Sequence, residues 1–463
     1  MRPVPHPRSS ALTPPPEGAA TRHRSRIGSL AALVVASVLA GCSGSAALHQ
    51  AAGPQHPAKH TTAPATNGAL PSGPPGPHFT SNGVLSTCQS TAVMNDALYI
   101  GSGHTIRRVD ARTGHSVLLA DTINSICGIA VDRAGNILFA GGTQVQVLAQ
   151  RAGHFYGQAM APGREYTIAG SPTADRHDQG LGDNGPARKA GYGRITGLAV
   201  DPAGNVLISD SGRRDCHGCD DMGSLVRVIA GRTGRFYAFG MKAGRSYTVA
   251  GIPSGIADAG HDQGPATGNS LGDTLGQVTT DRNGNLIIAD PATPTLHPPF
   301  APMVRVVPTR PGHYYGLAMK PGHIYTIAGN GHPGTIHDST PAAQAPLALA
   351  SGAAVDPAGN VVVADGTRLL VIAAATGQFW GQHMTKGDIY TIAGNGTPGS
   401  TGDGGLAREA PVSLASVTVD ISGNLILGPA NPADPVRVIA ASPNLFYGTR
   451  MLPWHIYGLG TAS

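Results

Sequence analysis

The sequence predicts an all-β protein made of repeated four-stranded units, and three observations support this prediction. The motif "VDPAGNV" occurs twice without change, at Val200–Val206 and Val355–Val361, and near-copies begin at Val131, Thr280 and Val419. Two further motifs follow it in a fixed order. The 463 residues also include 65 Gly and 38 Pro but only 13% charged residues, which favours short strands and turns over long charged helices.

The three motifs recur along most of the chain. The Asp of the first motif returns after 69, 80, 75 and 64 residues, at Asp132, Asp201, Asp281, Asp356 and Asp420. The second motif is "VRVI" or a relative, and the third is "YTIAG" or a relative, which begins at Tyr166, Tyr247, Tyr325 and Tyr390 and decays around Tyr457. Motifs that keep their order over five units define a repeat protein.

Each unit is predicted to contain four strands. In the third unit they are "GLAV" (Gly197–Val200), "NVLISD" (Asn205–Asp210), "LVRVIA" (Leu225–Ala230) and "SYTVAG" (Ser246–Gly251). All are short, rich in β-branched residues and separated by Gly, Pro and Asp. A degenerate unit at Ser90–Ala120 has the same order. Six units of four antiparallel strands predict a six-bladed β-propeller.

The pattern "GLAVDPAGNVLISD…VRVI…YTVAG" resembles the NHL repeat, whose units form six-bladed propellers. The resemblance covers about Ser86 to Gly460. The Asn-Arg pair that usually follows the second strand of an NHL unit is missing, and the loops lengthen the unit well beyond the roughly 40–45 residues of a compact blade. The resemblance implies an NHL-like propeller over residues 83–463.

The opening motif is interpreted as a turn. Asp201-Pro202-Ala203-Gly204 fits a type I turn, with Asp first, Pro second and Gly fourth. Gly204 can adopt the left-handed conformation that returns the chain to Asn205. A metal or phosphate site would not need five copies around one ring.

The first 41 residues are predicted to be a lipoprotein signal peptide. A basic stretch, Arg22–Arg26, precedes the apolar run Ile27–Ala40, which at 14 residues is shorter than the roughly 20 that span a bilayer. The segment ends in "LAGC", which resembles the bacterial lipobox and implies lipidation of Cys42, with export and anchoring to the outer face of the cell membrane. Residues 42–82 are rich in Ala, Pro and Gly and are predicted to be a flexible tether.

The charge distribution excludes one class of partner. Most of the net charge of +5 comes from the arginines of the signal peptide, and no run of Lys or Arg follows it. Nucleic-acid binding is therefore not expected.

The predicted inner strands argue against catalysis. They read "STAV", "CGIAV", "TGLAV", "GQVTT", "SGAAV" and "ASVTV" and contain no carboxylate, His, Lys or Arg. Propeller lactonases and lyases that resemble this fold hold calcium or zinc with such residues on the channel floor. We therefore expect no cofactor and favour a non-catalytic protein.

A second Asp recurs in the loop before each inner strand, at Asp183, Asp262, Asp338 and Asp403. Its constant spacing from the turn Asp favours an Asx-type turn that shapes the loop. A loop-borne metal site is the alternative. Its candidate ligands are His177, Asp178, His261 and Asp262, or the loop residues Cys216, His217 and Cys219.

An aromatic-Met motif lies between the third and fourth strands of five units. Its aromatic pairs are Phe155-Tyr156, Phe236-Tyr237, Tyr314-Tyr315, Phe379-Trp380 and Phe446-Tyr447. Packing between neighbouring outer strands is the favoured interpretation. If the rings are exposed, they form a rim that could bind a sugar or a polymer.

Four cysteines remain after Cys42, in a chain predicted to be exported, where disulfides persist. Cys88 and Cys127 each precede the inner strand of adjacent blades, and we predict that they pair. Cys216 and Cys219 are predicted to form a small disulfide within an unrepeated loop.

These observations favour an envelope-binding propeller held to the membrane only by its lipid, and a monomer. The partner would be an envelope protein, a polysaccharide or a small ligand. The alternatives are a metal-dependent hydrolase or lyase with a loop-borne site, and a passive envelope scaffold.

Overall fold

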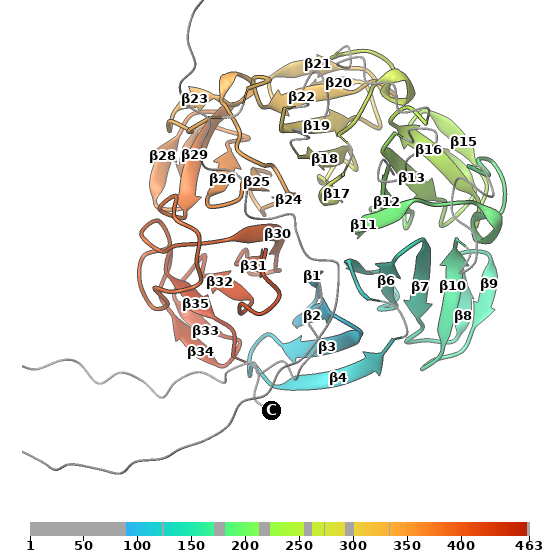
Figure 1. The fold of residues 1–463 in the computed structure, drawn as a ribbon, viewed down its shortest axis with the longest axis horizontal. Coiled ribbons are helices and arrows are strands. Elements are labelled where there is room, and N and C mark those ends of the chain that lie inside the picture. Colours follow the sequence, from blue (N-terminus) through green and yellow to red (C-terminus); the bar gives the residue numbers. More distant parts are fainter. Residues whose placement is uncertain are drawn as a thin grey trace, which may run out of the picture. The chain divides into compact units, whose positions relative to one another are not determined.

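The computed structural model describes eight stretches of the chain: residues 89–122, 125–170, 181–212, 223–253, 262–272, 274–291, 301–332 and 334–460. All of them belong to the second of the two units into which the chain divides, residues 71–463. They form a ring of six four-stranded antiparallel sheets (Figure 1). The predicted all-β, six-bladed propeller is confirmed. Within these stretches no helix is long and apolar enough to cross a membrane.

The first three blades occupy residues 89–250. Blade 1 contains β1 (Gln89–Met94), β2 (Ala97–Ser102), β3 (Thr105–Asp110) and β4 (Ser116–Asp121). Blade 2 contains β5 (Gly128–Val131), β6 (Ile137–Gly141), β7 (Gln144–Leu148) and β10 (Glu165–Ala169). Blade 3 contains β11 (Arg194–Val200), β12 (Val206–Ser211), β13 (Leu225–Ile229) and β16 (Ser246–Ala250).

The other three blades continue to residue 458. Blade 4 contains β17 (Val278–Thr280), β18 (Leu286–Asp290), β19 (Met303–Val307) and β22 (Tyr325–Ala328). Blade 5 contains β24 (Gly352–Val355), β25 (Val361–Ala364), β26 (Leu369–Ile372), β29 (Asp388–Ala393) and a short fifth strand, β23 (Thr340–Pro341). Blade 6 contains β30 (Leu414–Val419), β31 (Leu425–Pro429), β32 (Arg437–Ile439) and β35 (Ile456–Gly458).

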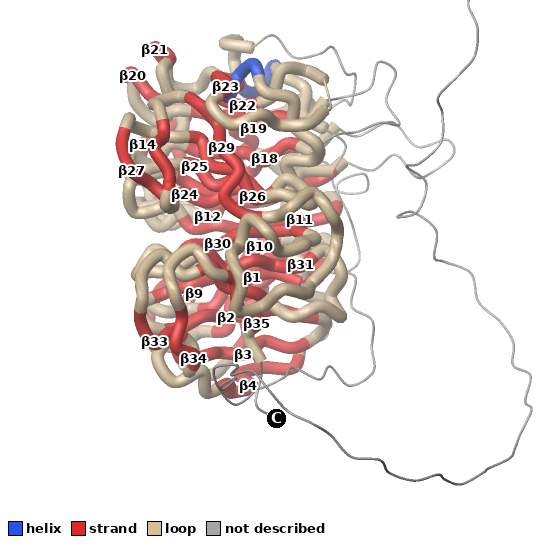
Figure 2. The backbone as a smooth tube through the Cα atoms, turned by 90° about the vertical axis from the view of Figure 1, so that its left-hand side faces the viewer, coloured by secondary structure: helices blue, strands red, loops and turns tan. Residues whose placement is uncertain are grey.

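Five blades insert a separate two-stranded hairpin between the third and fourth strands, where the aromatic-Met motif lies. The hairpins are β8 (Gly153–Phe155) with β9 (Gln158–Met160), β14 (Gly234–Phe236) with β15 (Phe239–Met241), β20 (Gly312–Tyr314) with β21 (Leu317–Met319), β27 (Gly377–Phe379) with β28 (Gln382–Met384), and β33 (Asn444–Phe446) with β34 (Thr449–Met451). In side view, hairpin strands such as β14, β20, β27 and β33 lie along one side of the ring (Figure 2). We call this side the turn face, because the turns between first and second strands contact these hairpins there.

Among the described residues each blade is built from one continuous stretch of chain, and no strand of another blade pairs with it to close the ring. Blades 6 and 1 meet through side chains and loops. The Thr418 hydroxyl donates to the carbonyl of Thr91 at 3.1 Å, and the amide of Tyr447 donates to the carbonyl of Ala111 at 2.6 Å. A shared apolar cluster that includes Leu98 and Ile426 lies between the two sheets.

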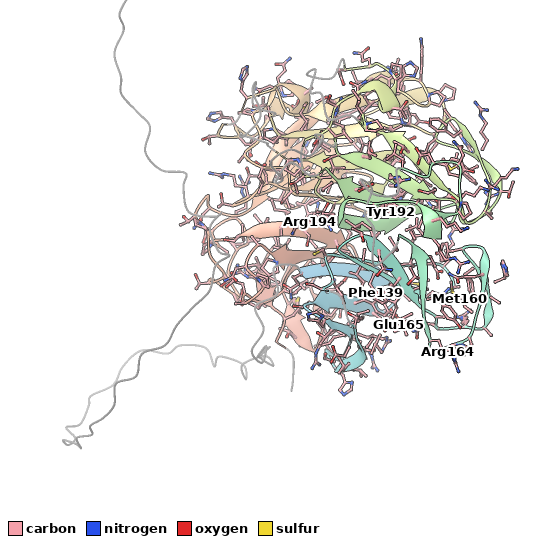
Figure 3. The ribbon with its side chains drawn as sticks, turned by 45° about the vertical axis from the view of Figure 1, so that its right-hand side comes forward. Phe139, Met160, Arg164, Glu165, Tyr192 and Arg194 are labelled. Carbon is pink, nitrogen blue, oxygen red and sulfur yellow. The ribbon has the colours of Figure 1, made fainter. Side chains whose placement is uncertain are left out.

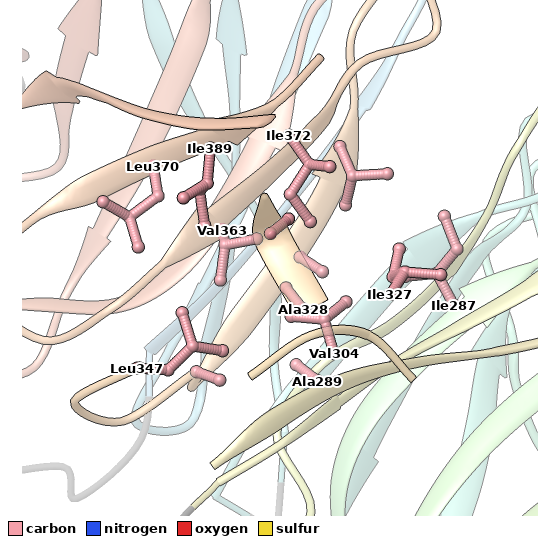
Figure 4. Close-up of a cluster of buried hydrophobic side chains, with 14 of the residues drawn as sticks. Ile287, Ala289, Val304, Ile327, Ala328, Leu347, Val363, Leu370, Ile372 and Ile389 are labelled. Atoms are coloured by element: carbon pink, nitrogen blue, oxygen red, sulfur yellow. The ribbon is translucent and has the colours of Figure 1, made fainter. Parts of the chain in front are cut away.

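The hydrophobic core consists of clusters between adjacent blades. Between blades 4 and 5, Ile287 and Val304 face Val363 and Leu370 (Figure 4). All four side chains are fully buried. Burial of a large aliphatic side chain stabilises a fold by about 1.5–3 kcal/mol, so repetition of such clusters around the ring provides most of its stability.

The outer strands of blades 3 to 6 have covered edges. In each of these blades, the segment that leads into the first strand runs along the fourth strand of the same blade. The bridges are Pro186 with Arg245, Pro265 with His323, β23 with β29, and Leu406 with His455. In three blades a 3-10 helix follows: η1 (Ala187–Lys189), η2 (Ala266–Gly268) and η3 (Ala342–Gln344). A covered edge cannot pair with another chain.

The loop Asp of this segment has a different role from the expected Asx-type turn. The Asp338 carboxylate accepts a hydrogen bond from the amide of Thr391 in β29 at 2.7 Å. Asp183 and Asp262 accept in the same way from Thr248 and Thr326. The expectation of a local turn was therefore wrong, because these carboxylates bind a strand more than 50 residues away and fix the leading segment to the blade edge.

Candidate functional site

The turn after the first strand has a buried carboxylate at its centre. In blade 3 the amide of Gly204 donates to the carbonyl of Asp201 at 2.9 Å, and Gly204 has a φ of 87°. This confirms the predicted type I turn. Asp201 Oδ1 accepts from the amides of Ala203 and Asn205, both at 2.8 Å. The carboxylate therefore organises the turn from within.

The following Asn links this turn to the third strand. Asn205 Nδ2 donates to Asp201 Oδ2 at 2.7 Å, and Asn205 Oδ1 accepts from the amide of Gly231, just beyond β13, at 3.0 Å. The equivalent Asn is fully buried in blades 2 to 6. A buried amide with both ends bonded explains why "GN" recurs in every copy.

The second aromatic residue of each hairpin completes this network. The Tyr237 hydroxyl donates to Asp201 Oδ2 at 3.0 Å. The other four contacts are Tyr156 to Asp132 at 3.1 Å, Tyr315 to Asp281 at 3.2 Å, Trp380 Nε1 to Asp356 at 3.2 Å and Tyr447 to Asp420 at 3.1 Å. We call this Asp–Asn–aromatic network the turn lock.

The aromatic residue of the turn lock has an uncommon backbone conformation. Tyr237 has a φ of 49°, and Trp380 has a φ of 52°. A two-residue hairpin loop of type I′ needs positive φ at both positions, which costs a residue with a Cβ roughly 1–2 kcal/mol. The hydrogen bond to a buried carboxylate and the burial of the ring offset this cost.

The turn lock decides the position of the predicted aromatic rim. The second ring of each pair is turned inward, and Tyr156, Tyr237 and Tyr447 are buried. The first rings, Phe155, Phe236, Tyr314 and Phe379, are half-buried, and Phe446 is buried. These half-buried first rings present aromatic surface to solvent, as do the half-buried second rings Tyr315 and Trp380.

Burial also fixes the protonation of the tyrosines. It raises the pKa of Tyr237 well above its usual value of 10, and the negative charge of Asp201 raises it further. The same two causes raise the pKa values of Tyr156, Tyr315 and Tyr447. These phenols therefore keep their protons and act only as hydrogen-bond donors.

The turns surround a pocket of about 380 Å³ at the mouth of the central channel on the turn face. Its walls come from blades 2 to 6: Val131, Arg133, Val200, Asp201, Pro202, Thr280, Asp281, Arg282, Val355, Asp356, Pro357, Val419 and Asp420. The carboxylates are buried within their turn locks. The exposed residues of the wall are Arg133, Pro202, Arg282 and Pro357. We call this the mouth pocket.

One side chain crosses the ring close to this pocket. Gln277, which directly precedes β17, accepts a hydrogen bond at Oε1 from the amide of Val417 in blade 6, at 2.9 Å. It passes over Gly352 of blade 5, where an added Cβ would lie 2.5 Å from Oε1. Only glycine leaves room for this contact, which joins three blades beside the channel.

Buried arginines form a second layer of charge, which sequence reasoning missed. Arg227 in β13 donates to the carbonyls of Gly191 and Leu181, both at 2.6 Å, and to Asp183 Oδ1 at 2.8 Å. Arg437 holds Asp403 in blade 6 at 2.8 Å. The available signal was the "VRV" of the third strand, together with the loop Asp. Each arginine fixes the leading segment of its blade.

In blade 4 the buried arginine, Arg305, faces a carboxylate, Asp290, with an oxygen that is not hydrogen-bonded among the described residues. Asp290 Oδ2 lies 3.8 Å from Arg305 Nη1 and has no hydrogen-bond partner among the described residues. Burial raises the pKa of Asp290 to about 6, against the opposing effects of Arg305 and of the bond from the Gly272 amide. This carboxyl group therefore titrates near neutral pH.

Of the candidate metal ligands, the structure describes Asp262. Asp262 is engaged by the amide of Thr326 at 2.6 Å. Within the described stretches no group of three His, Cys, Asp or Glu residues could hold a metal. The remaining candidates, His177, Asp178, Cys216, His217, Cys219 and His261, lie outside them.

The predicted disulfides stay predictions, because Cys88, Cys216 and Cys219 are not among the described residues. Cys127 is half-buried just before β5. The strands that follow Cys88 and Cys127 contact each other, since the amide of Ile129 donates to the Ser90 hydroxyl at 3.3 Å. This contact is what the Cys88–Cys127 pairing requires.

Comparisons with known proteins matched the chain to solved structures of low sequence identity. No family model and no curated protein matches the chain. Solved structures that resemble it include a protein of unknown function from Bacteroides thetaiotaomicron, with 12% identity, a TM-score of 0.46 and coverage of 77% of this chain and 70% of that chain. A gluconolactonase from Xanthomonas campestris has 12% identity, a TM-score of 0.41 and coverage of 75% and 85% respectively. Likeness at this level carries no argument about activity.

We predict that Tyr237→Phe destabilises the full chain by about 1.5–3 kcal/mol, because it removes a hydrogen bond to a buried carboxylate. The change can be measured by urea unfolding. Tyr314→Phe, which changes the half-buried first ring of a pair, is the matched control and should stay within about 0.5 kcal/mol. Equal effects of the two substitutions would contradict the turn lock.

We also predict that Asp290 makes stability fall as pH rises from about 4 to about 7. Its folded pKa of about 6 exceeds the ordinary aspartate pKa of 3.8, so the folded state binds more protons than the unfolded state in this window. The stabilisation is complete at low pH and is lost through pH 6. Unfolding free energies measured across this range should slope less in Asp290→Asn, and an unchanged slope would show that Asp290 titrates normally.

Proposed function

We propose that this chain is an exported, lipid-anchored propeller of NHL-like blades that binds an envelope partner at the mouth pocket and does not catalyse a reaction. One observation carries the proposal. The carboxylates around the mouth pocket are used within the turn locks, while the exposed wall residues are two arginines and two prolines. The pocket is thus suited to holding a ligand rather than to transforming one.

The bonding of the carboxylates supports the non-catalytic role. A general acid, a general base or a metal ligand needs an oxygen that can reach the substrate or the ion. The turn carboxylates each accept from amides, an Asn and an aromatic donor, and Asp365 at the opposite end of its strand accepts from three backbone amides. Asp290 is buried against Arg305. The alternative of a metal-dependent hydrolase or lyase therefore depends on loop residues other than these.

The exposed side chains indicate the chemistry of the ligand. Arg133 and Arg282 can each bind a carboxylate or phosphate through a planar guanidinium. Pro202 and Pro357 alternate with these arginines around the ring and provide apolar surface. An acidic group next to an apolar one, presented by an envelope protein, a polysaccharide or a small molecule, fits this wall.

Binding of the labelled full chain to isolated bacterial envelope fragments tests the proposal. We expect the Arg133→Ala/Arg282→Ala double variant to bind at least about tenfold more weakly, since each lost charged contact is worth about 1.5–3 kcal/mol. Arg194→Ala, at the opposite end of β11, is the control and should bind as the original chain does. Unchanged binding by the double variant would contradict the proposal, as would a stoichiometric bound metal together with hydrolysis of a lactone.

The lipid anchor has a test of its own. A cell that expresses the chain with a radiolabelled fatty-acid precursor should label the protein and retain it in the membrane fraction. The Cys42→Ala variant should lose both the label and the membrane association, because a thiol is needed to form the thioether. Ser43→Ala, a substitution at the neighbouring residue, is a suitable control. Label that persists in Cys42→Ala would disprove the lipobox.

A further inference from the structure

The outer edge of blade 1 differs from those of blades 3 to 6. Within the described part of the chain, β4 pairs only with β3, and no leading segment bridges it. The link between these two strands, residues 111–115, is too short to contain an aromatic hairpin. Blade 1 therefore presents the backbone groups of a regular strand at the circumference of the ring (Figure 1).

The middle of this edge is also apolar, although its last residue, Asp121, is exposed. Val117 is 41% exposed and Leu118 is 50% exposed, in the middle of β4. Blade 2 also has no bridged leading segment in the described residues, but Arg164 and Glu165 place exposed charges at its outer strand (Figure 3). Charges of this kind keep an edge from pairing, whereas two exposed aliphatic residues favour it.

We propose that the edge of β4 binds residues 76–82 of the same chain, "GPHFTSN". The spacing of the covered blades gives the register. In blades 3 to 6, the bridging residue precedes the first residue of the turn by 15, 16, 15 and 14 positions. The turn of blade 1 begins at Asn95, directly after β1, so the same count gives positions 79–81.

The composition of the segment fits this position. Between Ser43 and Asn82 the large apolar residues are Leu48, Leu70 and Phe79, and Phe79 falls at the predicted bridge.

Backbone hydrogen bonds and apolar burial would both stabilise this pairing. Pairing would satisfy the outward backbone groups of β4. Val117 and Leu118 point to opposite faces of the sheet, so Phe79 would remove one of them from water. The predicted tether would then end near residue 75 instead of residue 82. This inference does not depend on the proposed binding function.

Hydrogen–deuterium exchange of the full chain tests the proposal. We expect the amides of β4 to be protected, and Phe79→Asp to speed their exchange by at least about tenfold. Leu70→Asp, an equivalent change outside the predicted register, should leave β4 protected. Fast exchange of β4 in the original chain, or equal exchange in the two variants, would overturn the proposal. Protection that rises with protein concentration would assign the edge to a second copy instead.

A cross-link provides a second test that does not depend on a destabilising charge. The pair Phe79→Cys/Leu118→Cys should form a disulfide on mild oxidation, identified by mass spectrometry of a digest. The pair Leu70→Cys/Leu118→Cys should not. Failure of the first pair, or equal yields from both, would place the segment elsewhere.

Discussion

The hydrogen bonds accepted by one buried carboxylate organise each of blades 2 to 6. Asp201 shows the arrangement: its two oxygens accept from the turn amides, from Asn205 and from the Tyr237 hydroxyl. A carboxylate taken out of water must be fully bonded, because an unpaired buried charge costs several kcal/mol. The residues that meet this requirement come from the first turn, the end of the third strand and the hairpin. The blade can therefore close only when all three are in place.

This constraint determines what the turn face can do. A ring of carboxylates around a channel mouth suggests a cation site or an acid–base centre when its burial and bonding are unknown. Here the oxygens are directed into the blades, and the positions next to them in the turn face solvent instead. Those positions carry Arg133, Pro202, Arg282 and Pro357, so the chemistry of the mouth pocket comes from the residues that vary between the repeats.

A second set of contacts, between buried arginines and the loop Asp, fixes the outer edges of the blades. Buried arginines such as Arg227 and Arg437 hold the loop Asp, and the loop Asp holds the segment that covers the blade edge. Blades 1 and 2 lack this arrangement in the described part of the chain. Blade 2 has Arg164 and Glu165 at its edge, whereas the middle of the blade 1 edge has the exposed aliphatic residues Val117 and Leu118. The edge of blade 1 is thus where the repeat is incomplete and where a further segment can pair.

The sequence alone determined the number of blades, the order of the strands and the turn at Asp201, because turns and strand alternation depend on neighbouring residues. It also showed that the predicted inner-strand segments have no carboxylate, His, Lys or Arg, although the structure extends the first strand of blade 3 to Arg194. The tertiary structure decided the roles of the remaining polar and aromatic residues. Tyr237 and Asp201 are 36 residues apart, Thr391 and Asp338 are 53 apart, and Gln277 and Val417 are 140 apart. Contacts at such separations depend on how blades and loops pack in space, which local backbone preferences do not specify.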